Sequence, residues 1–413
     1  MCFGNYYVSR NQLLQHYIQQ EHTEMKSKRM SKAERSSLDI ISTLPQNILE
    51  TILCRLPTKE AARTSILSRE WRYTWTKISK LEFYVLTRIA GQDVGIRLIP
   101  FYDILQVLLW HQGLIHEFSL FMYHSTTDQD SFDFDQVVLH LTKNHAVKKL
   151  VLQGLNKLSW HKLPKSVFSL HHLTDLDLTY FVLDYQPIFN GFGSRLRSLS
   201  LSNVEISTKT LLHLLSNCPS LKTLALFIGE SHLGGKDCTV IELFKCLPMI
   251  EHLSTFGDVF EWLVLDSVPQ GLPTLLLHLK YFCFKNMWFD CGNGLAFLLV
   301  LTKCSPNLKK IKLEINFHET CYKEHPAVVW EEYSDVWLEH LNELEIISFG
   351  HLKQEIEFVK FILARSPKLS KVSLRSMRCE KERLEMLQAL LRAPRASHNL
   401  CLTVPLKYAR SFR

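Results

Sequence analysis

Cysteine and histidine are the residue types in this sequence that could bind a metal or form a nucleophile and base pair. The chain has 11 Cys and 19 His. Its closest cysteine pairs are Cys238 with Cys246 and Cys283 with Cys291. Structural zinc sites place paired cysteines only about two to four residues apart, so this spacing excludes zinc ribbons and RING domains. An odd number of cysteines indicates free thiols in a reducing compartment.

Three cysteines lie close to a proline at the end of an apolar segment, namely Cys218, Cys246 and Cys304. A helix is expected to end there and a strand to begin, so these thiols are predicted to be small buried side chains without chemistry. No Gly-x-Ser-x-Gly, P-loop, His-Glu-x-x-His or Gly-x-Gly-x-x-Gly motif occurs. The sequence therefore predicts no catalytic residues, no metal and no cofactor.

Length and composition indicate how such a chain is built. At 413 residues the protein is too long for one compact core, so at least two units or a repeat array are required. It contains 69 Leu, about one residue in six, which exceeds ordinary usage. A formal charge of +7 from 48 basic and 41 acidic residues is spread along the chain, which makes a nucleic-acid partner unlikely.

Residues 1–36 are polar and are predicted to form a flexible tail. The segment carries a basic cluster interrupted by Glu24 and Glu34, which favours a solvated charge run over a nuclear localisation element. Met1, Met25 and Met30 are alternative start residues. The start of the chain lacks the apolar core of a secretory signal, and no apolar stretch reaches the length of a membrane span, so we expect the nucleus, the cytoplasm or both.

From residue 39 to 75 the apolar residues follow helical spacing. Pro45 is expected to open a first helix and Pro57 to close it, while Thr58 is expected to cap a second. A third helix is predicted after Ser68, through Trp71. A unit of about forty residues has too little interior to bury so many apolar side chains, so part of this surface must face a partner.

Beyond residue 110 a leucine-rich pattern recurs, L-x-x-L-x-L, with Ile, Val or Phe substituting. The copies are about 23 to 33 residues apart, which is typical of leucine-rich repeats. The copy at Ile250 is weak because Thr255 holds its third position. The first positions are Ile115, Val147, Leu173, Leu196, Leu221, Ile250, Leu279, Leu308, Leu341 and Leu369. We predict an α/β fold in which three N-terminal helices precede a solenoid, a curved parallel sheet with helices on its convex side.

The segment 37–83 resembles the F-box in the version common in plants. The matching features are Leu44-Pro45, Ile48-Leu49, Ile52-Leu53, Leu56-Pro57, Ala61-Ala62, Thr64-Ser65, Leu67-Ser68 and Trp71-Arg72. Gln46 and Glu70 depart from the family pattern. The resemblance implies docking onto a Skp-type adaptor and, through it, association with a cullin and a RING subunit. The predicted adaptor-binding residues are Leu44, Pro45, Ile48, Leu49, Ile52, Leu53, Leu56, Pro57, Leu67 and Trp71.

A second resemblance covers 336–400, where Leu341 to Ile346, Phe349-Gly350 and Glu355 to Ala364 look like the FBD domain behind plant F-box and leucine-rich repeats. Physically these residues form two more solenoid units. The remaining assignments are leucine-rich repeats at 115–335, a linker or capping unit at 84–114 and a C-terminal tail at 401–413.

Alternate residues of each repeat strand point away from the core, onto the concave face. From these positions we predict a substrate-binding surface of Phe227, Phe256, Tyr281, Lys310 and Lys312, because aromatic and cationic residues are enriched in interface hot spots. The alternative is a solvated sheet with Phe227 and Phe256 turned into the core.

These features predict a non-catalytic substrate-recognition subunit of an SCF-type cullin-RING ubiquitin ligase. The F-box would bind the adaptor and the repeats an unknown protein target. The alternative is a leucine-rich-repeat interaction scaffold without a degradative role. The sequence identifies neither the target, nor the signal that marks it, nor a small-molecule ligand.

Overall fold

The structure is a computed structural model of the 413-residue chain. It describes residues 44–404 apart from the segments 69–70, 87–100, 124–127, 145, 155–160, 184–191, 230–232, 235–238, 258, 260–270, 273–274, 290–293, 317–329, 351 and 377–379. The tail predicted at 1–36 therefore lies outside the described residues.

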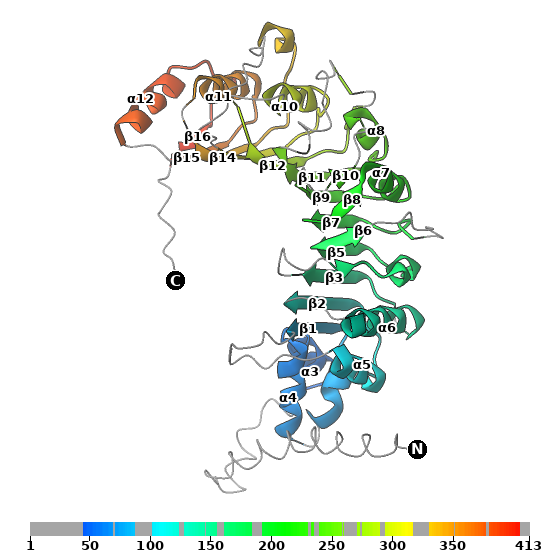
Figure 1. The fold of residues 1–413 in the computed structure, drawn as a ribbon. Coiled ribbons are helices and arrows are strands. Elements are labelled where there is room, and N and C mark those ends of the chain that lie inside the picture. Colours follow the sequence, from blue (N-terminus) through cyan, green and yellow to red (C-terminus); the bar gives the residue numbers. More distant parts are fainter. Residues whose placement is uncertain are drawn as a thin grey trace, which may run out of the picture.

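A single sheet of 12 parallel strands runs from one end of the molecule to the other. The strands stack into an arc, with the helices along its outer side and the N-terminal helices below the first strand (Figure 1). This confirms the predicted solenoid. In spatial order the strands are β1 (Lys80–Leu86), β2 (Glu117–Tyr123), β3 (Lys149–Gly154), β5 (Asp175–Thr179), β7 (Ser198–Ser202), β9 (Thr223–Phe227), β11 (His252–Phe256), β12 (Tyr281–Met287), β13 (Lys310–Ile315), β14 (Glu343–Phe349), β15 (Lys371–Ser376) and β16 (Cys401–Thr403).

The strands show the period of two that the repeat pattern predicts. In β5 and β7 every second residue is a fully buried leucine and the residues between are half-buried. Even the weak copy at Ile250 forms β11, where the buried Thr255 hydroxyl donates a hydrogen bond to the Phe256 carbonyl oxygen at 3.2 Å. A hydroxyl can therefore replace a leucine methyl group in this core because it has a local acceptor.

Helices connect most strands and pack against the buried side of the sheet. They are α5 (Phe101–Trp110), α6 (Asp128–Asn144), η4 (Lys165–Ser169), α7 (Thr208–Ser216), α8 (Val240–Lys245), α10 (Gly294–Lys303), η6 (Trp330–Tyr333), α11 (Lys353–Arg365) and α12 (Glu380–Leu391). None of the described helices combines the length and apolarity needed to cross a bilayer.

A second, four-stranded sheet lies on the helix side of the first in the middle repeats (Figure 1). It consists of β4 (His161–Lys162), β6 (Phe181–Leu183), β8 (Glu205–Ser207) and β10 (Leu233–Gly234). Two residues with positive φ, Tyr180 (61°) and Asn203 (49°), follow β5 and β7 directly. Their left-handed conformation turns the chain from the main sheet into the second one.

The N-terminal unit differs from the predicted three helices. Its described part has two α-helices, α3 (Gln46–Leu53) and α4 (Thr58–Arg63), and two 3-10 segments, η2 (Thr64–Ile66) and η3 (Trp71–Lys77). The third helix is 3-10 because Trp71–Lys77 contains three aromatic residues and two threonines, which are weak α-helix formers.

Thr58 is the first residue of α4 and does not cap it. Its hydroxyl oxygen instead accepts a hydrogen bond from the Glu82 amide of β1 at 2.7 Å. Helix α4 ends where the Thr64 and Ser65 hydroxyls donate back to the carbonyl oxygens of the preceding turn, both at 2.6 Å. Such side-chain bonds compete with continuation of a helix.

The helical unit is continuous with the solenoid, since the span 84–114 contributes the end of β1 and helix α5 to it. The backbone N–H of Gln112 donates to the Thr76 carbonyl oxygen at 2.8 Å. The buried ring of His111 places Nε2 2.8 Å from the Ile78 carbonyl oxygen and Nδ1 3.0 Å from that of Gly113. Burial lowers the pKa of His111.

The C-terminal end departs from the predicted boundary at 401. Cys401–Thr403, predicted as the start of the tail, forms β16 and pairs with β15. The short terminal strand β16 pairs with the backbone groups at the edge of β15. The repeat pattern does not show this strand because Asn399 stands where the preceding copy has Leu369, although Leu402 holds the position of Val372.

Candidate partner-binding surfaces

Helix α3 presents an apolar face to solvent. Ile48 and Ile52 are one helical turn apart and 42% and 40% exposed, whereas Leu49 and Leu53 are buried in the core. The spacing of four residues places the two isoleucines on one face. Apolar side chains left this accessible on a short helix are available for a partner.

The other predicted adaptor-binding residues are divided between surface and core. Leu67 is 67% exposed, and Pro45 is exposed at the start of α3. Trp71 is buried in the core. Leu44, Leu56 and Pro57 are half-buried. Of the ten residues, the accessible ones are therefore Pro45, Ile48, Ile52 and Leu67, and the deeply buried ones are Leu49, Leu53 and Trp71. Whether the accessible ones bind an adaptor stays a prediction.

Sequence reasoning missed Tyr73, which is 63% exposed in η3. Trp71 and Thr74 are one 3-10 turn apart and both buried, so Tyr73 lies on a different face of η3.

The concave face of the sheet consists of in-register rows of side chains. Thr223, His252, Tyr281 and Lys310 are direct partners in successive strands from β9 to β13. The row continues with Glu343 in β14. The structure thus brings the predicted Tyr281 and Lys310 together on one face of adjacent strands.

Phe227 and Phe256 remain on this face and do not turn into the core. Both are half-buried, and their ring centroids are 5.2 Å apart. Phe256 packs partly against the core. The Lys285 ammonium nitrogen lies 4.2 Å from the centroid of Phe227, close enough for a cation–π interaction. Lys285 was absent from the predicted surface, although the period of two places it on the same face.

Lys310 and Lys312 are both engaged in ion pairs. Lys310 Nζ lies 2.9 Å from Glu343, and Lys312 Nζ lies 3.3 Å from Glu345. Each carboxylate also binds a cation of β15: Glu343 contacts Lys371 at 2.9 Å, and Glu345 contacts Arg375 at 3.0 Å. Hydrogen bonds from Lys371 and Lys310 lower the pKa of Glu343. The predicted cations thus belong to two triads in which two cations share one carboxylate.

Tyr281 and Cys283 interact on the same strand, and burial raises the pKa of both groups. Burial also raises the pKa of the Cys218 thiol to about 12. These thiols remain protonated at neutral pH, which disfavours nucleophilic chemistry.

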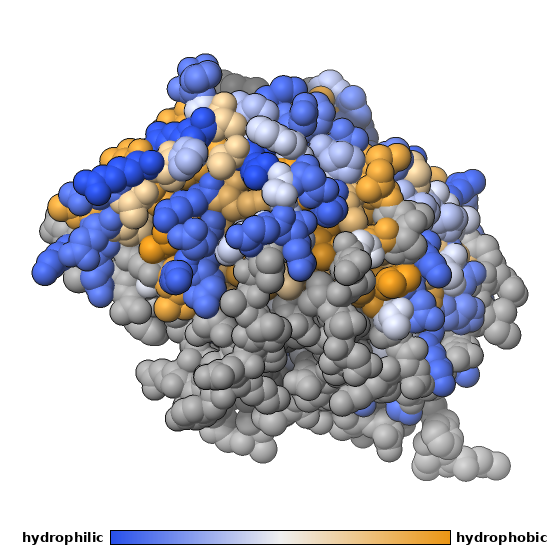
Figure 2. Space-filling view, turned by 90° about the horizontal axis from the view of Figure 1, so that it is seen from above, coloured by the Kyte–Doolittle hydropathy of each residue, from blue (hydrophilic) through white to orange (hydrophobic). Residues whose placement is uncertain are grey.

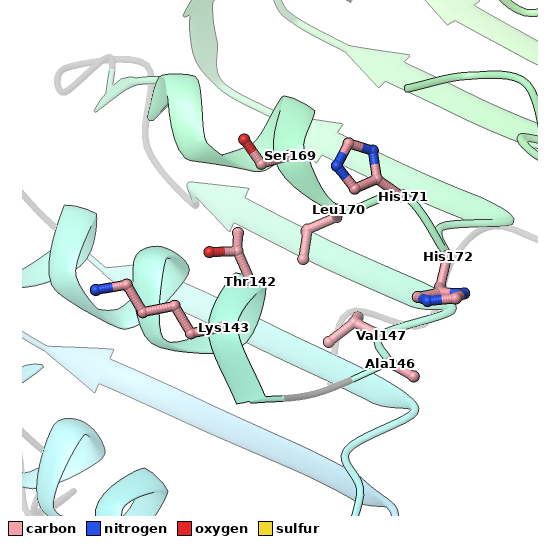
Figure 3. A pocket seen from close by; sticks show the side chains of 8 residues that line it. All are labelled: Thr142, Lys143, Ala146, Val147, Ser169, Leu170, His171 and His172. Carbon is pink, nitrogen blue, oxygen red and sulfur yellow. The ribbon is translucent and has the colours of Figure 1, made fainter. Parts of the chain in front are cut away.

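Among the described residues, no group of three His, Cys, Asp or Glu side chains could hold a metal ion. A hollow of about 320 Å³ lies on the edge where β3 and β5 begin, lined by the end of α6 and by the turn that carries His171 and His172 (Figure 3). It is open, and its two histidines are exposed. Such a shallow hollow lacks the enclosure typical of small-molecule sites.

Comparison with known proteins identifies the chain. A family model of the F-box domain matches residues 41–83, and one of the leucine-rich repeats of FBD-associated F-box protein At5g56370 matches residues 136–239. The F-box/FBD/LRR-repeat protein At1g13570 of Arabidopsis thaliana is 30% identical, over 87% of this chain and 97% of its own length. The chain belongs to the F-box/FBD/LRR-repeat family. This confirms the resemblance seen in the sequence.

Two other Arabidopsis thaliana proteins are similar to this family member over most of its length. The F-box/FBD/LRR-repeat protein At3g26920 is 24% identical, over 88% of this chain and 96% of its own. The FBD-associated F-box protein At5g56370 is 25% identical, over 87% of this chain and 98% of its own length. F-box domains generally bind Skp-type adaptors. This F-box/FBD/LRR-repeat protein is therefore of the SCF-type, adaptor-binding class, whose members are non-enzymatic.

The opposite end of the F-box/FBD/LRR-repeat protein also has accessible apolar side chains. Seen from above, hydrophilic and apolar areas lie side by side over the C-terminal repeats (Figure 2). Leu384 and Leu391 of α12 are 57% and 60% exposed. They provide a matched comparison for the exposed residues of α3.

Proposed function

We propose that this protein is the substrate-recognition subunit of an SCF-type cullin-RING ubiquitin ligase. Its F-box binds a Skp-type adaptor, which brings the cullin and the RING subunit. Its repeats bind the protein to be ubiquitinated. The chain itself carries out no chemistry and acts in the nucleus, the cytoplasm or both.

The exposed face of α3 is the observation that carries the proposal. Ile48 and Ile52 remain accessible although the helix has buried Leu49 and Leu53 in the core that it shares with the solenoid. Burial of an exposed aliphatic side chain stabilises an interface by about 1.5 to 3 kcal/mol when complete. Two isoleucines that a partner buries together can anchor an interface in the way that hot-spot residues do.

The hydrogen-bonded connection between the F-box and the repeats supports an action by positioning. The Thr58 hydroxyl accepts from the Glu82 amide at 2.7 Å, and Gln112 donates to the Thr76 carbonyl oxygen at 2.8 Å. A target bound to the concave face is then held in a fixed place relative to the adaptor. Such tethering raises the effective concentration of the reacting groups.

Co-purification with a Skp-type adaptor tests the proposal. The wild-type chain is expected to retain the adaptor, and the double variant Ile48→Glu, Ile52→Glu is expected to lose it. The matched control is Leu384→Glu, Leu391→Glu, which places the same charges on more exposed apolar positions at the other end. Loss of adaptor by both double variants, or by neither, would contradict the assignment of this face.

The ligase role is separated from a non-degradative scaffold by two further readouts. A ligase subunit is expected to co-purify with cullin, and its target is expected to accumulate when the chain is depleted. A chain that binds the adaptor but shows neither behaviour is a scaffold.

A further inference from the structure

The concave face of the sheet has an uneven distribution of charge, and this distribution defines the target segment that it fits. The first four strands place two cations against four carboxylates on this face. These residues are Lys80, Lys149, Glu82, Glu117, Asp175 and Asp177. Lys80 pairs with Glu82 of the same strand at 3.2 Å. The F-box end of the face therefore carries an excess of negative charge.

Asp175 and Asp177 of β5, like Glu117 of β2, are carboxylates of this section that lie outside the Lys80–Glu82 ion pair. Asp177 accepts a hydrogen bond from Gln153 at 3.5 Å, and Asp175 accepts one from the Thr174 hydroxyl at 2.6 Å. Neither forms an ion pair with a lysine or arginine of the described residues, although Lys149 is the strand partner of Asp175. Both remain half-buried and accessible on the face.

The middle strands β7, β9 and β11 carry no formal charge on this face when histidine is neutral. Their outward positions are small or aromatic: Ser198, Ser200, Ser202, Thr223, Ala225, Phe227, His252, Ser254 and Phe256. Small side chains let a partner backbone approach the sheet closely, while the half-buried Phe227 and Phe256 provide apolar contact. This stretch favours an uncharged segment with apolar side chains.

The strands β12 to β15 place five cations against three carboxylates on the same face. These residues are Lys285, Lys310, Lys312, Lys371, Arg375, Glu314, Glu343 and Glu345. In each triad one carboxylate neutralises only one of its two cations. Lys285 forms no ion pair with a carboxylate of the described residues and rests on the ring of Phe227. This end of the face therefore attracts carboxylates.

The two charged sections are separated by a distance that an extended peptide can span. Strand β12 is the fourth neighbour after β5 in the sheet. Neighbouring strands are about 4.8 Å apart, so the separation is about 20 Å. An extended chain rises about 3.3 Å per residue and crosses this distance in about six residues.

We propose that the concave face binds an extended segment of the target with basic residues at one end, about six small or apolar residues in the middle, and acidic residues at the other end. The basic end lies over Asp175 and Asp177, nearer the F-box, and the acidic end lies over Lys285 and the cations beyond it. The inference rests on the proposed function, whose target it describes by its chemistry.

Four labelled synthetic peptides test the charge pattern against the full chain bound to its adaptor, by fluorescence anisotropy at low salt. All share a central six-residue segment of Ala, Ser and Phe. One carries paired lysines at one end and paired glutamates at the other, one has lysines at both ends, and one has glutamates at both ends. The fourth, alternating peptide has the same two lysines and two glutamates as the first, but each end carries one lysine and one glutamate. We expect the bipolar peptide to bind about tenfold more tightly than the other three.

Charge-reversal variants show whether the named residues cause the preference. Asp175→Lys combined with Asp177→Lys is expected to shift the preference to the peptide with glutamates at both ends. Such a gain cannot arise from misfolding. Lys285→Glu is expected to weaken binding of the bipolar peptide about fivefold. The control Lys353→Glu, at an exposed position of α11 on the convex side, should leave the affinities of all four peptides unchanged.

Three outcomes overturn the inference: equal binding of the bipolar and alternating peptides, no shift of preference in the aspartate variant, or no binding of any peptide up to about 1 mM. The adaptor complex is prepared first, so its formation is scored separately. A wild-type chain that fails to bind the adaptor contradicts the proposed function, whereas a complex that forms but ignores the charge pattern contradicts this inference alone.

Discussion

Truncation of Ile48, Ile52 and Leu67, the accessible isoleucine and leucine side chains among the predicted adaptor-binding residues, should weaken adaptor binding by an amount that follows from their exposure. Ile48, Ile52 and Leu67 are 42%, 40% and 67% exposed, which together amount to about one and a half fully exposed side chains. With about 2 kcal/mol for complete burial of one such side chain, the triple alanine variant should lose about 3 kcal/mol of binding free energy. This corresponds to a dissociation constant about 100-fold higher.

Titration calorimetry of the purified chain with a Skp-type adaptor measures this loss. Because these side chains are accessible, the thermal midpoint of the free triple variant should fall by only a few degrees. A dissociation constant within about threefold of wild type, in a variant that remains folded, would refute the assignment of this face. A loss confined to Leu67→Ala alone would refute the assignment of α3 while leaving the domain itself as the binding element.

Two further changes probe packing and electrostatics. Leu53→Ala should lower the free energy of unfolding by about 2 to 5 kcal/mol because the Leu53 side chain is fully buried. Ile52→Ala, at the preceding and exposed residue, should lower it by less than about 1 kcal/mol. Urea denaturation of both variants measures the difference. Lys222 and Lys280 lower the pKa of Glu251 to about 2, so the carboxylate stabilises the fold above the unfolded-state pKa and loses this effect as the pH falls toward 2. The stability gap between wild type and Glu251→Gln should therefore be constant near neutral pH and narrow below about pH 4.5 in thermal denaturation series, and a gap that widens toward acid would contradict this sign.

The repeats were predictable because the leucine pattern has a physical period. Leu176 and Leu178 are alternate residues of β5, so both point into the core. Leu199 and Leu201 do the same in β7. The F-box was predictable from its order of apolar pairs and prolines. Neither inference needed a distance, because the repeats follow from the local period of the chain and the F-box from the resemblance of its residues to the family pattern.

The ion pairs of the concave face were predictable in principle and were missed. Alignment of the first repeat positions makes Lys310, Glu343 and Lys371 direct strand neighbours, as the structure has them. Lys310 is predicted from its strand position to face a partner, whereas in the structure it forms an ion pair with Glu343. The position of Lys285 over Phe227 depends on side-chain rotamers two strands apart, which repeat spacing does not determine.

The connection between the F-box and the first repeat decides whether adaptor and target are held in a fixed relative position, and Gly113 lies at a close backbone approach within it. A Cβ atom at this position would lie 2.6 Å from the carbonyl oxygen of Lys77, closer than real contacts allow. The Gly113 amide also donates to the Thr76 carbonyl oxygen at 3.2 Å, so the two backbone segments cannot separate without loss of hydrogen bonds.

Gly113→Ala should therefore destabilise the chain by about 1 to 3 kcal/mol and increase hydrogen exchange at the junction amides of Gln112 and His116. The control is Gly271→Ala, where an added Cβ meets nothing within 4 Å. If the junction positions the target, ubiquitin transfer should fall more than adaptor or target binding, because only the fixed geometry has been lost. Equal exchange and equal transfer in the two alanine variants would show that the F-box and the repeats act as independent modules.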